Sequence, residues 1–336
     1  MGVNRRPRRS MKYRLHTVWP LLMLVLAIIV ARSYAQNVTG NSELPRSESV
    51  PPHLEPASWP DDTLTIASLG HASVLLNYFG VRAISDPSLF TRVGFSIDSI
   101  LTIGPKRHVD PPLAPAELQQ LDVILITHAH MDHLDIPSLK ALPKNVVVIA
   151  CSKCSSLIAP LGFKDIRELN WGEETVVKGL RIRAMGARHW GRRWPPFGED
   201  YGFNSYVLEK NGHRILLACD SADTDLFASV ASNPPDVAIF SIGAYDPWIY
   251  NHANPEQVWA MFRQTGARYL IPVHWGTFRL SKEPMEEPLE RLIAAAGDEQ
   301  SRIVIRQIGG AWTLPAAAEV RAAAPRAGAT APPSGR

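Results

Sequence analysis

Four side chains that commonly bind metal ions fall within six consecutive positions, in the order His128, His130, Asp132 and His133. An apolar run, Val123–Ile126, precedes them and predicts a buried strand, while Asp135 and Pro137 predict the start of a helix. The cluster should therefore lie on a strand-to-helix loop. Imidazole and carboxylate groups suit zinc or a similar divalent ion. Because one ion cannot easily take four ligands from so short a loop, we expect two ions.

Three further ligand-type residues follow strand-like runs. His189 comes shortly after residues 181–185, Asp220 directly follows residues 214–219, and His274 directly follows residues 269–273. Each of them alone could be a structural residue. Because the strands of one sheet end near a common edge, however, we expect all three to converge on the first cluster.

Several segments together resemble the metallo-β-lactamase superfamily, whose signature is the His-x-His-x-Asp-His loop. More narrowly, the chain is similar to N-acyl-phosphatidylethanolamine-hydrolysing phospholipase D over residues of about 64–313. The matching segments are residues 69–73, 85–87, 104–107, 127–135, 169–174, 188–190, 242–245, 252–256 and 273–278. The family usually has Gly-Asp-Thr around its bridging aspartate, whereas this chain has Cys219-Asp220-Ser221 and keeps the ligand.

The resemblance implies a four-layer αββα sandwich, in which two mixed sheets pack face to face with helices outside. It also implies two bound Zn²⁺ or other divalent ions. One ion would be held by His128, His130 and His189, the other by Asp132, His133 and His274, and Asp220 would bridge them. Such a pair of ions holds a bridging hydroxide and stabilises charge on phosphoryl oxygens.

Other residues are expected around the ions. Asp86 and His71 would lie behind the ligands and orient them. The resemblance places Tyr245 and His252 beside the substrate, where they would contact a phosphate oxygen or protonate the leaving group. Arginine forks suit phosphate, and a tryptophan could line an acyl groove, so the flanking substrate candidates are Arg188, Arg192, Arg193 and Trp190. Trp171 and Trp275 are expected in the core.

The ends of the chain differ from its centre. Six basic residues and no acidic ones occupy the first sixteen positions, and an apolar run follows at residues 18–31. This order indicates a signal peptide over residues 1–35, and hence export to the periplasm, or an uncleaved membrane anchor. A linker or arm at residues 36–60, a hydrolase domain at 61–315 and a disordered tail at 316–336 complete the predicted organisation.

The net charge of +3 becomes −3 once the six N-terminal basic residues are set aside. The remaining chain has no basic footprint, so we expect no nucleic-acid partner. A phospholipid or small molecule is the expected substrate, with association at a membrane surface, and a homodimer is compatible with the sequence.

The three cysteines are too few for a disulfide scaffold. Cys151 and Cys154 form a Cys-x-x-Cys pair that could be redox-active, bind zinc or close a disulfide, and unpaired thiols are favoured at this strand-helix junction. Cys219 is expected to be a small buried residue rather than a nucleophile.

Three functional hypotheses remain at this point. The first is a zinc-dependent phosphodiesterase of the phospholipase D type. The second is a lactonase or ester hydrolase that resembles ascorbate-6-phosphate lactonases. The third is a scaffold that binds metal or a partner without turnover, against which the seven intact ligand positions argue.

Overall fold

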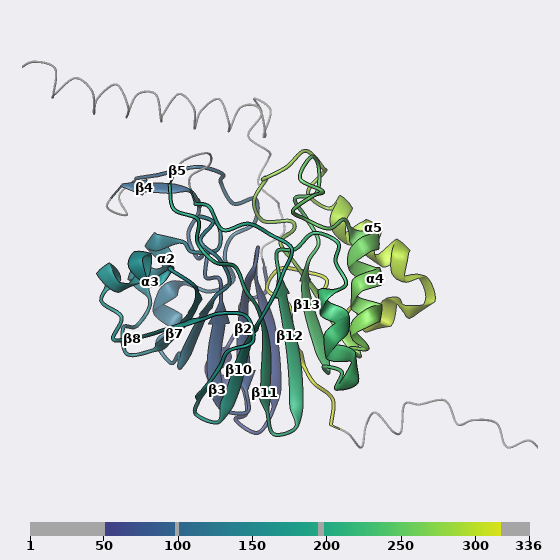
Figure 1. Ribbon diagram of the computed structural model, residues 1–336, viewed down its shortest axis with the longest axis horizontal. Coiled ribbons are helices and arrows are strands. Elements are labelled where there is room, and N and C mark those ends of the chain that lie inside the picture. Colours follow the sequence, from purple (N-terminus) through teal and green to yellow (C-terminus); the bar gives the residue numbers. More distant parts are fainter. Residues whose placement is uncertain (1–50, 98–100, 194–197, 317–336) are drawn as a thin grey trace, which may run out of the picture.

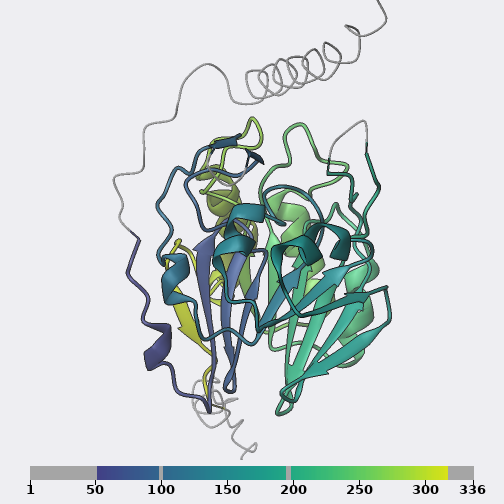
Figure 2. The same ribbon diagram turned by 90° about the vertical axis from the view of Figure 1, so that its left-hand side faces the viewer.

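The computed structural model describes residues 51–97, 101–193 and 198–316. Two β-sheets face each other and helices cover their outer faces, which confirms the expected αββα sandwich (Figures 1 and 2). The expected signal peptide or anchor, and the tail from residue 317, lie outside the described residues, as does the arm before residue 51. No helix in the described part of the chain is both long and apolar enough to cross a membrane.

The first sheet has seven strands, in the order β15 (Ala311–Thr313), β1 (Leu64–Gly70), β2 (Ser73–Tyr78), β3 (Val81–Ser85), β6 (Val123–Ile126), β7 (Val147–Cys151) and β8 (Asp165–Leu169). The second has six, in the order β14 (Tyr269–Val273), β13 (Val237–Ser241), β12 (His213–Cys219), β11 (Ser205–Lys210), β10 (Leu180–Met185) and β9 (Glu174–Val177). In each sheet, antiparallel neighbours give way to parallel ones, at β3–β6 and at β12–β13.

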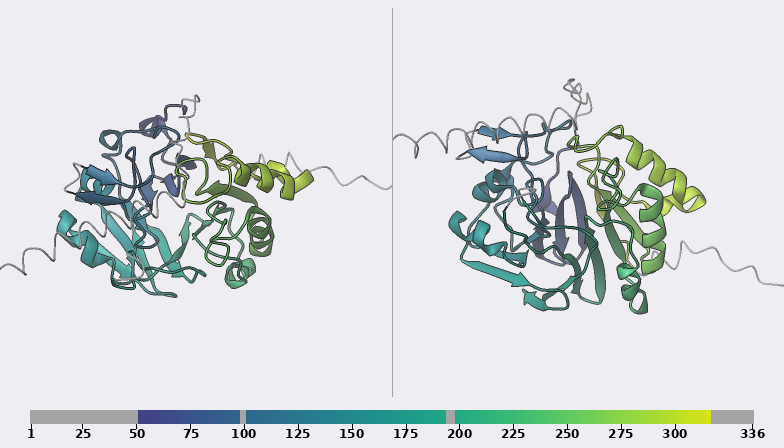
Figure 3. Two further views of the ribbon diagram at one scale, coloured as in Figure 1. Left: turned by 90° about the horizontal axis from the view of Figure 1, so that it is seen from above. Right: turned by 45° about the horizontal axis from the view of Figure 1, so that its top comes forward.

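The helices connect the parallel strands, as such crossovers require. Helices α2 (Ile136–Ala141) and α3 (Ser155–Ile158) follow β6 and β7, α4 (Pro255–Thr265) precedes β14, and α5 (Glu287–Ala296) packs on α4. A separate hairpin of β4 (Phe95–Ile97) and β5 (Leu101–Ile103) stands above α2 (Figure 1). The views of Figure 3 show α4 and α5 on the side of the sandwich opposite α2 and α3.

Alternation along the strands explains the layers. In β6, Val123 and Leu125 face the core between the sheets, whereas Ile124 and Ile126 face the core beneath α2 and α3. In β12, Ile215 and Leu217 face the space between the sheets, while the alternate residues pack toward α4. Because successive side chains of a strand point to opposite faces, a strand covered on both sides must be apolar throughout.

The helix boundaries follow local chemistry. Asp135 caps α2 as predicted, because its Oδ2 accepts the Ser138 backbone N–H at 3.0 Å. Helix α5 begins at Glu287. Pro288 lacks an N–H and therefore suits the first turn, so the helix cannot place it further inside.

We predict that Ile182→Ala destabilises the fold by about 2–5 kcal/mol, because Ile182 is fully buried between the sheets. Urea unfolding followed by circular dichroism measures the loss. Val176→Ala on the neighbouring strand β9 is the matched control, since Val176 is 54% exposed and should change stability by less than about 0.5 kcal/mol. Equal losses in the two variants would contradict the assigned inter-sheet core.

Candidate metal centre

Two imidazoles from the loop between β6 and α2 meet a third from the other sheet. His128 Nε2 lies 2.8 Å from His130 Nδ1, which lies 3.3 Å from His189 Nε2. His189 comes from the segment after β10, in the other sheet. A tetrahedral cation with bonds of about 2.0–2.1 Å keeps its ligand atoms roughly 3.3 Å apart, so this first donor set has the spacing of a metal site.

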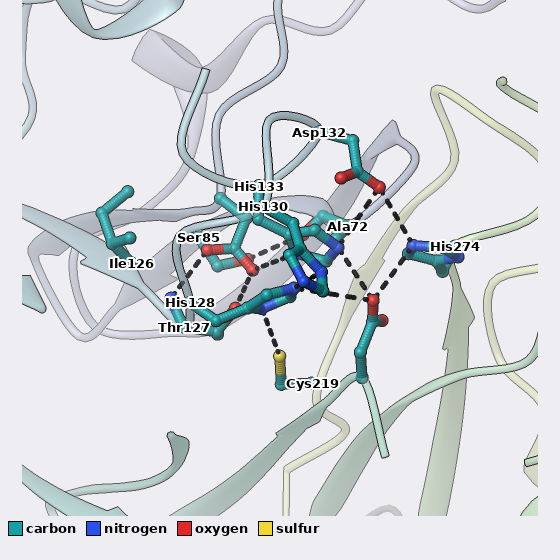
Figure 4. A network of polar contacts seen from close by, with 12 residues as sticks. Ala72, Ser85, Ile126, Thr127, His128, His130, Asp132, His133, Cys219 and His274 are labelled. Carbon is teal, nitrogen blue, oxygen red and sulfur yellow. Dashed lines mark hydrogen bonds and ion pairs between the residues drawn. The ribbon is translucent and has the colours of Figure 1, made fainter. Parts of the chain in front are cut away.

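A second donor set lies beside the first. His274 Nε2 is 3.5 Å from Asp132 Oδ2 and 3.2 Å from Asp220 Oδ2. His133 Nε2 is 3.6 Å and 3.0 Å from the same two oxygens. Figure 4 shows His133, Asp132 and His274 pointing toward one another, with dashed contacts joining them. These four nitrogen–oxygen distances are again those of ligands around one cation.

The carboxylate of Asp220 connects the two sets. Its Oδ2 approaches both histidines of the second set and also lies 3.9 Å from His128 Nε2 in the first. Its Oδ1 accepts a 2.5 Å hydrogen bond from the Ser241 hydroxyl at the end of β13. The structure therefore brings all seven expected ligands into one cluster, in which Asp220 occupies the shared position.

A second layer of polar contacts orients the ligands. Asp86, directly after β3, accepts from His133 Nδ1 at 2.9 Å and from the Thr127 backbone N–H at 2.8 Å. His189 Nδ1 lies 3.0 Å from the backbone oxygen of Asn251, and this carbonyl can only accept. These bonds place the proton on Nδ1 and leave Nε2 of His133 and His189 free to bind a cation.

The pKa values separate the two sets. Burial lowers the pKa of His128 and His130 well below the usual range and that of His189 to about 4, so this set is neutral at pH 7. Burial acts in the same direction on His274, but the carboxylates of Asp220 and Asp132 outweigh it and raise its pKa to about 9. The second set therefore holds protons that a cation would displace.

A divalent cation fits the residues present. Nε2 of His133 and Nε2 of His274 are buried and make no hydrogen bond despite the carboxylate oxygens nearby. Orphaned buried nitrogens are rare in proteins and call for an explanation. Imidazole and carboxylate donors at these spacings are the ligands of zinc and related ions, and a cation in each set would satisfy both nitrogens.

His71 stands against the second set. It follows β1, is 2% exposed, and its Nε2 lies 2.8 Å from Asp132 Oδ2. Its ring centroid is 4.0 Å from that of His274. These contacts are those of a residue that orients a ligand.

His252 also reaches the cluster, from the segment before α4. Its Nδ1 is buried without a hydrogen-bond partner and lies 3.9 Å from Asp220 Oδ2. Burial lowers its pKa to about 3, and the imidazole is neutral at pH 7. A neutral imidazole donates one N–H but has no extra proton to give away.

The side chain of Tyr245 makes polar and ring contacts with α5. Its hydroxyl donates to Glu287 Oε1 at 2.8 Å, and the Arg291 guanidinium lies 4.9 Å from its ring centroid. Both contacts come from α5. Because the hydroxyl donates its proton to Glu287, it has none to give a substrate in this arrangement, and its expected catalytic role stays a prediction.

The expected phosphate-binding arginines are also occupied elsewhere. Arg193 Nη1 donates to the backbone oxygens of Ala129 and Leu134, so Arg193 supports the metal loop from behind. Arg188 donates to Asp223 O, and Arg192 lies 3.7 Å from Asp200. Trp190 is near the site, with its ring centroid 4.5 Å from that of His130. A phosphate role for these arginines therefore finds no support in their contacts.

Trp171 corrects a further expectation. The side chain is 54% exposed rather than in the core. Its Nε1 donates to Phe203 O, and the Phe203 ring in turn faces His189 edge-on. Trp275 is half-buried against the core beneath α4. Trp171 lies at the turn between β8 and β9, where no sequence pattern distinguishes a tryptophan at the rim of a site from one in the core.

Comparison with known proteins agrees with the fold. The family described as the Beta-lactamase superfamily domain matches residues 94–275. The chain belongs to the metallo-β-lactamase superfamily. Solved structures support the fold alone. A possible metal-dependent hydrolase from Veillonella parvula is 20% identical with a TM-score of 0.61, covering 75% of this chain and all of its own.

Several proteins are similar to this chain in sequence. An uncharacterized protein of Mycobacterium tuberculosis is 31% identical over 72% of this chain and 66% of its own length. N-acyl-phosphatidylethanolamine-hydrolyzing phospholipase D 1 of Caenorhabditis elegans is 28% identical, covering 73% of this chain and 74% of its own. The mitochondrial enzyme of that name from Saccharomyces cerevisiae is 32% identical over 72% and 54%. The match thus spans just under two thirds of the mycobacterial relative and about half of the yeast one.

We predict that Asp86→Asn weakens metal binding by about 10- to 100-fold, because His133 loses the carboxylate that orients its ring. Competition with a chromophoric chelator measures the affinity. Asp61→Asn is the control, because Asp61 is an exposed residue whose carboxylate pairs with Arg82. Unchanged affinity in Asp86→Asn would remove Asp86 from the orienting layer.

The stability of the metal-free protein should pass through a maximum near pH 6.5. Below this pH, the histidines of the first set have lowered pKa values in the folded protein. The unfolded chain therefore binds more protons than the folded protein, and stability rises with pH. Above it, the stabilisation from His274, complete below its usual pKa of 6.5, is lost as the pH rises through about 9.

Thermal unfolding of chelator-treated protein between pH 4 and pH 10 checks this maximum. Bound metal would take the place of the proton on His274, so the fall in melting temperature above pH 6.5 should become smaller. His274→Asn should also reduce this fall in melting temperature in the metal-free protein. A melting temperature that rises steadily through pH 9 would refute the assigned charges.

Proposed function

We propose that this protein is a zinc-dependent phosphodiesterase of the phospholipase D type, acting on N-acyl-phosphatidylethanolamine or a related phospholipid. The observation that carries the proposal is the pair of donor sets joined by the Asp220 carboxylate. Two divalent cations bound there would supply an acidified water molecule and stabilise negative charge on phosphoryl oxygens.

The choice of a phospholipid rests on two supports. The first is the similarity to relatives that carry the name of N-acyl-phosphatidylethanolamine-hydrolyzing enzymes. The second is a pocket of ≈ 170 Å³ beside the metal loop, lined by Gly94, Phe95, Ser96, Met131, Ile136 and Arg193. Met131 lies between two expected ligands, so an apolar chain in this pocket would bring a headgroup close to the donor sets.

The hairpin above this pocket extends the apolar surface. Phe95 and Ile97 of β4 and Leu101 of β5 are exposed, as is Phe90 just before the hairpin. Exposed apolar patches of this kind commonly contact membranes or partners. We propose that the hairpin lies against the lipid from which the substrate is taken, with the protein exported to that membrane face.

The protein's own residues define the rest of the mechanism. His71 holds the Asp132 carboxylate, and Asp86 holds the His133 ring, so the second set keeps its geometry during turnover. His252 is a neutral imidazole beside Asp220. It therefore suits donation of an N–H to a phosphoryl oxygen better than protonation of the leaving group, and we propose the first of these two roles for it.

The substrate assignment is tested with purified protein, its metal content verified, on N-acyl-phosphatidylethanolamine in mixed micelles. Phosphatidic acid should be released, and Asp220→Asn should lower the rate by more than about 100-fold because the shared ligand is lost. Metal-loaded protein that releases no phosphatidic acid would refute the proposal. Release of fatty acid, or hydrolysis of a lactone instead, would favour the ester-hydrolase alternative.

His252→Ala should lower kcat/KM by about 10- to 100-fold, the value of one hydrogen bond to a charged group. Metal content should not change, since His252 lies outside both proposed ligand sets. His213→Ala is the control, because His213 pairs with Asp236 in a partly exposed contact on β12. A loss of metal in His252→Ala would instead make His252 a ligand.

A further inference from the structure

Two cysteines that the proposed reaction does not use lie face to face near the metal loop. Cys151 ends β7, Cys154 immediately precedes α3, and both are fully buried. Their sulfur atoms are 3.0 Å apart, about 1 Å more than a disulfide bond. A backbone hydrogen bond from Cys154 N–H to Cys151 O closes the turn between them.

This turn supports the segment that holds His128. Gly202 N–H donates to Ser152 O at 2.9 Å, and a side chain on Gly202 would collide with the backbone of Ser152. The next residue, Phe203, bridges to His128, and Asn204 N–H donates to Thr127 O at 2.8 Å. The conformation of the Cys-x-x-Cys turn therefore reaches His128 through one intervening segment.

The surroundings exclude two other uses of the pair. Among the described residues, the groups able to hold a metal ion include neither Cys151 nor Cys154. A reactive thiol needs exposure and a low pKa. Here the Cys154 thiol and burial both raise the pKa of Cys151, and neither sulfur reaches solvent. The pair is thus suited to neither zinc binding nor thiol-exchange catalysis in the folded protein.

We infer that Cys151 and Cys154 form a structural disulfide, closed while the chain folds in an oxidising compartment, and that Cys219 remains a thiol. The inference reverses the preference for unpaired thiols drawn from the sequence. It rests on the facing sulfurs, on their burial and on the expected export of the chain, and it does not depend on which substrate the metal centre takes. The bond would fix the turn that carries residues 202–204.

The oxidation needs a disulfide donor, either a protein or a small molecule such as oxidised glutathione. One cysteine thiolate attacks the donor and releases one donor thiol. The second cysteine then displaces the other donor half, forming the Cys151–Cys154 bond. The pair loses two electrons and two protons, and the donor is reduced to two thiols. Because both sulfurs are buried after folding, the reaction must precede final packing.

The sequence allows a decisive test. Lys153 stands between the two cysteines, so trypsin separates them into peptides 145–153 and 154–164. Full-length protein, exported to the periplasm of a bacterial host, is denatured without reductant, alkylated and digested. We expect one alkylated thiol, at Cys219, and the two peptides joined by mass. After reduction, three alkylated cysteines and two separate peptides should appear.

Three alkylated cysteines before reduction would overturn the inference, as would a bond from either cysteine to Cys219. Cys219→Ser is the matched variant and should show no alkylation before reduction and two afterwards. The double variant Cys151→Ser, Cys154→Ser should melt at a lower temperature than the oxidised protein, as should the reduced wild type. If the double variant fails to fold, the thiol count and the linked peptides of the wild type still decide the question.

Discussion

The placement of the Asp220 carboxylate within a cluster of buried histidines is the interaction on which the centre depends. Burial opposes charge on every one of these groups, yet His133 and His274 are held protonated by the carboxylates between them, and the carboxyl pKa of Asp220 lies well below its usual range in turn. The Ser241 hydroxyl fixes the remaining oxygen of Asp220. Opposite charges thus stabilise in the metal-free fold the arrangement that a cation would require, so the site is largely built before a metal enters.

The backbone contributes a second constraint at the same edge of the sheets. His71, Asp86, Cys219 and His274 have φ values of 53°, 38°, 60° and 64°, in the region that favours glycine. Each such residue costs about 1–2 kcal/mol relative to ordinary backbone. All four adjoin strand ends, where a left-handed residue turns the chain sharply and directs a side chain into the cluster. The usual glycine of the family before the bridging aspartate fits this conformation, and Cys219 adopts it nonetheless.

Much of this architecture could be predicted from the residues at the ends of the strands. Apolar runs ending in ligand-type residues predicted β6, β12 and β14 and the convergence of His128, Asp220 and His274, because a buried strand and its edge are local features. Long-range partners could not be predicted in the same way. Nothing near Tyr245 indicates that Glu287 takes its hydroxyl, and nothing near Arg193 indicates that it supports the metal loop. Those outcomes depend on packing between segments that lie far apart in the sequence.

Both sheets contribute ligands to the metal centre. The loop after β6 supplies ligands from one sheet, while the segments after β10, β12 and β14 supply the others. The core between the sheets therefore also sets the separation of the ligands. A displacement of one sheet by a fraction of an ångström would change every distance across the centre while leaving each sheet intact. Metal occupancy would then depend on the relative position of the two sheets. A measurement of bound metal would therefore also report whether the whole sandwich is correctly packed.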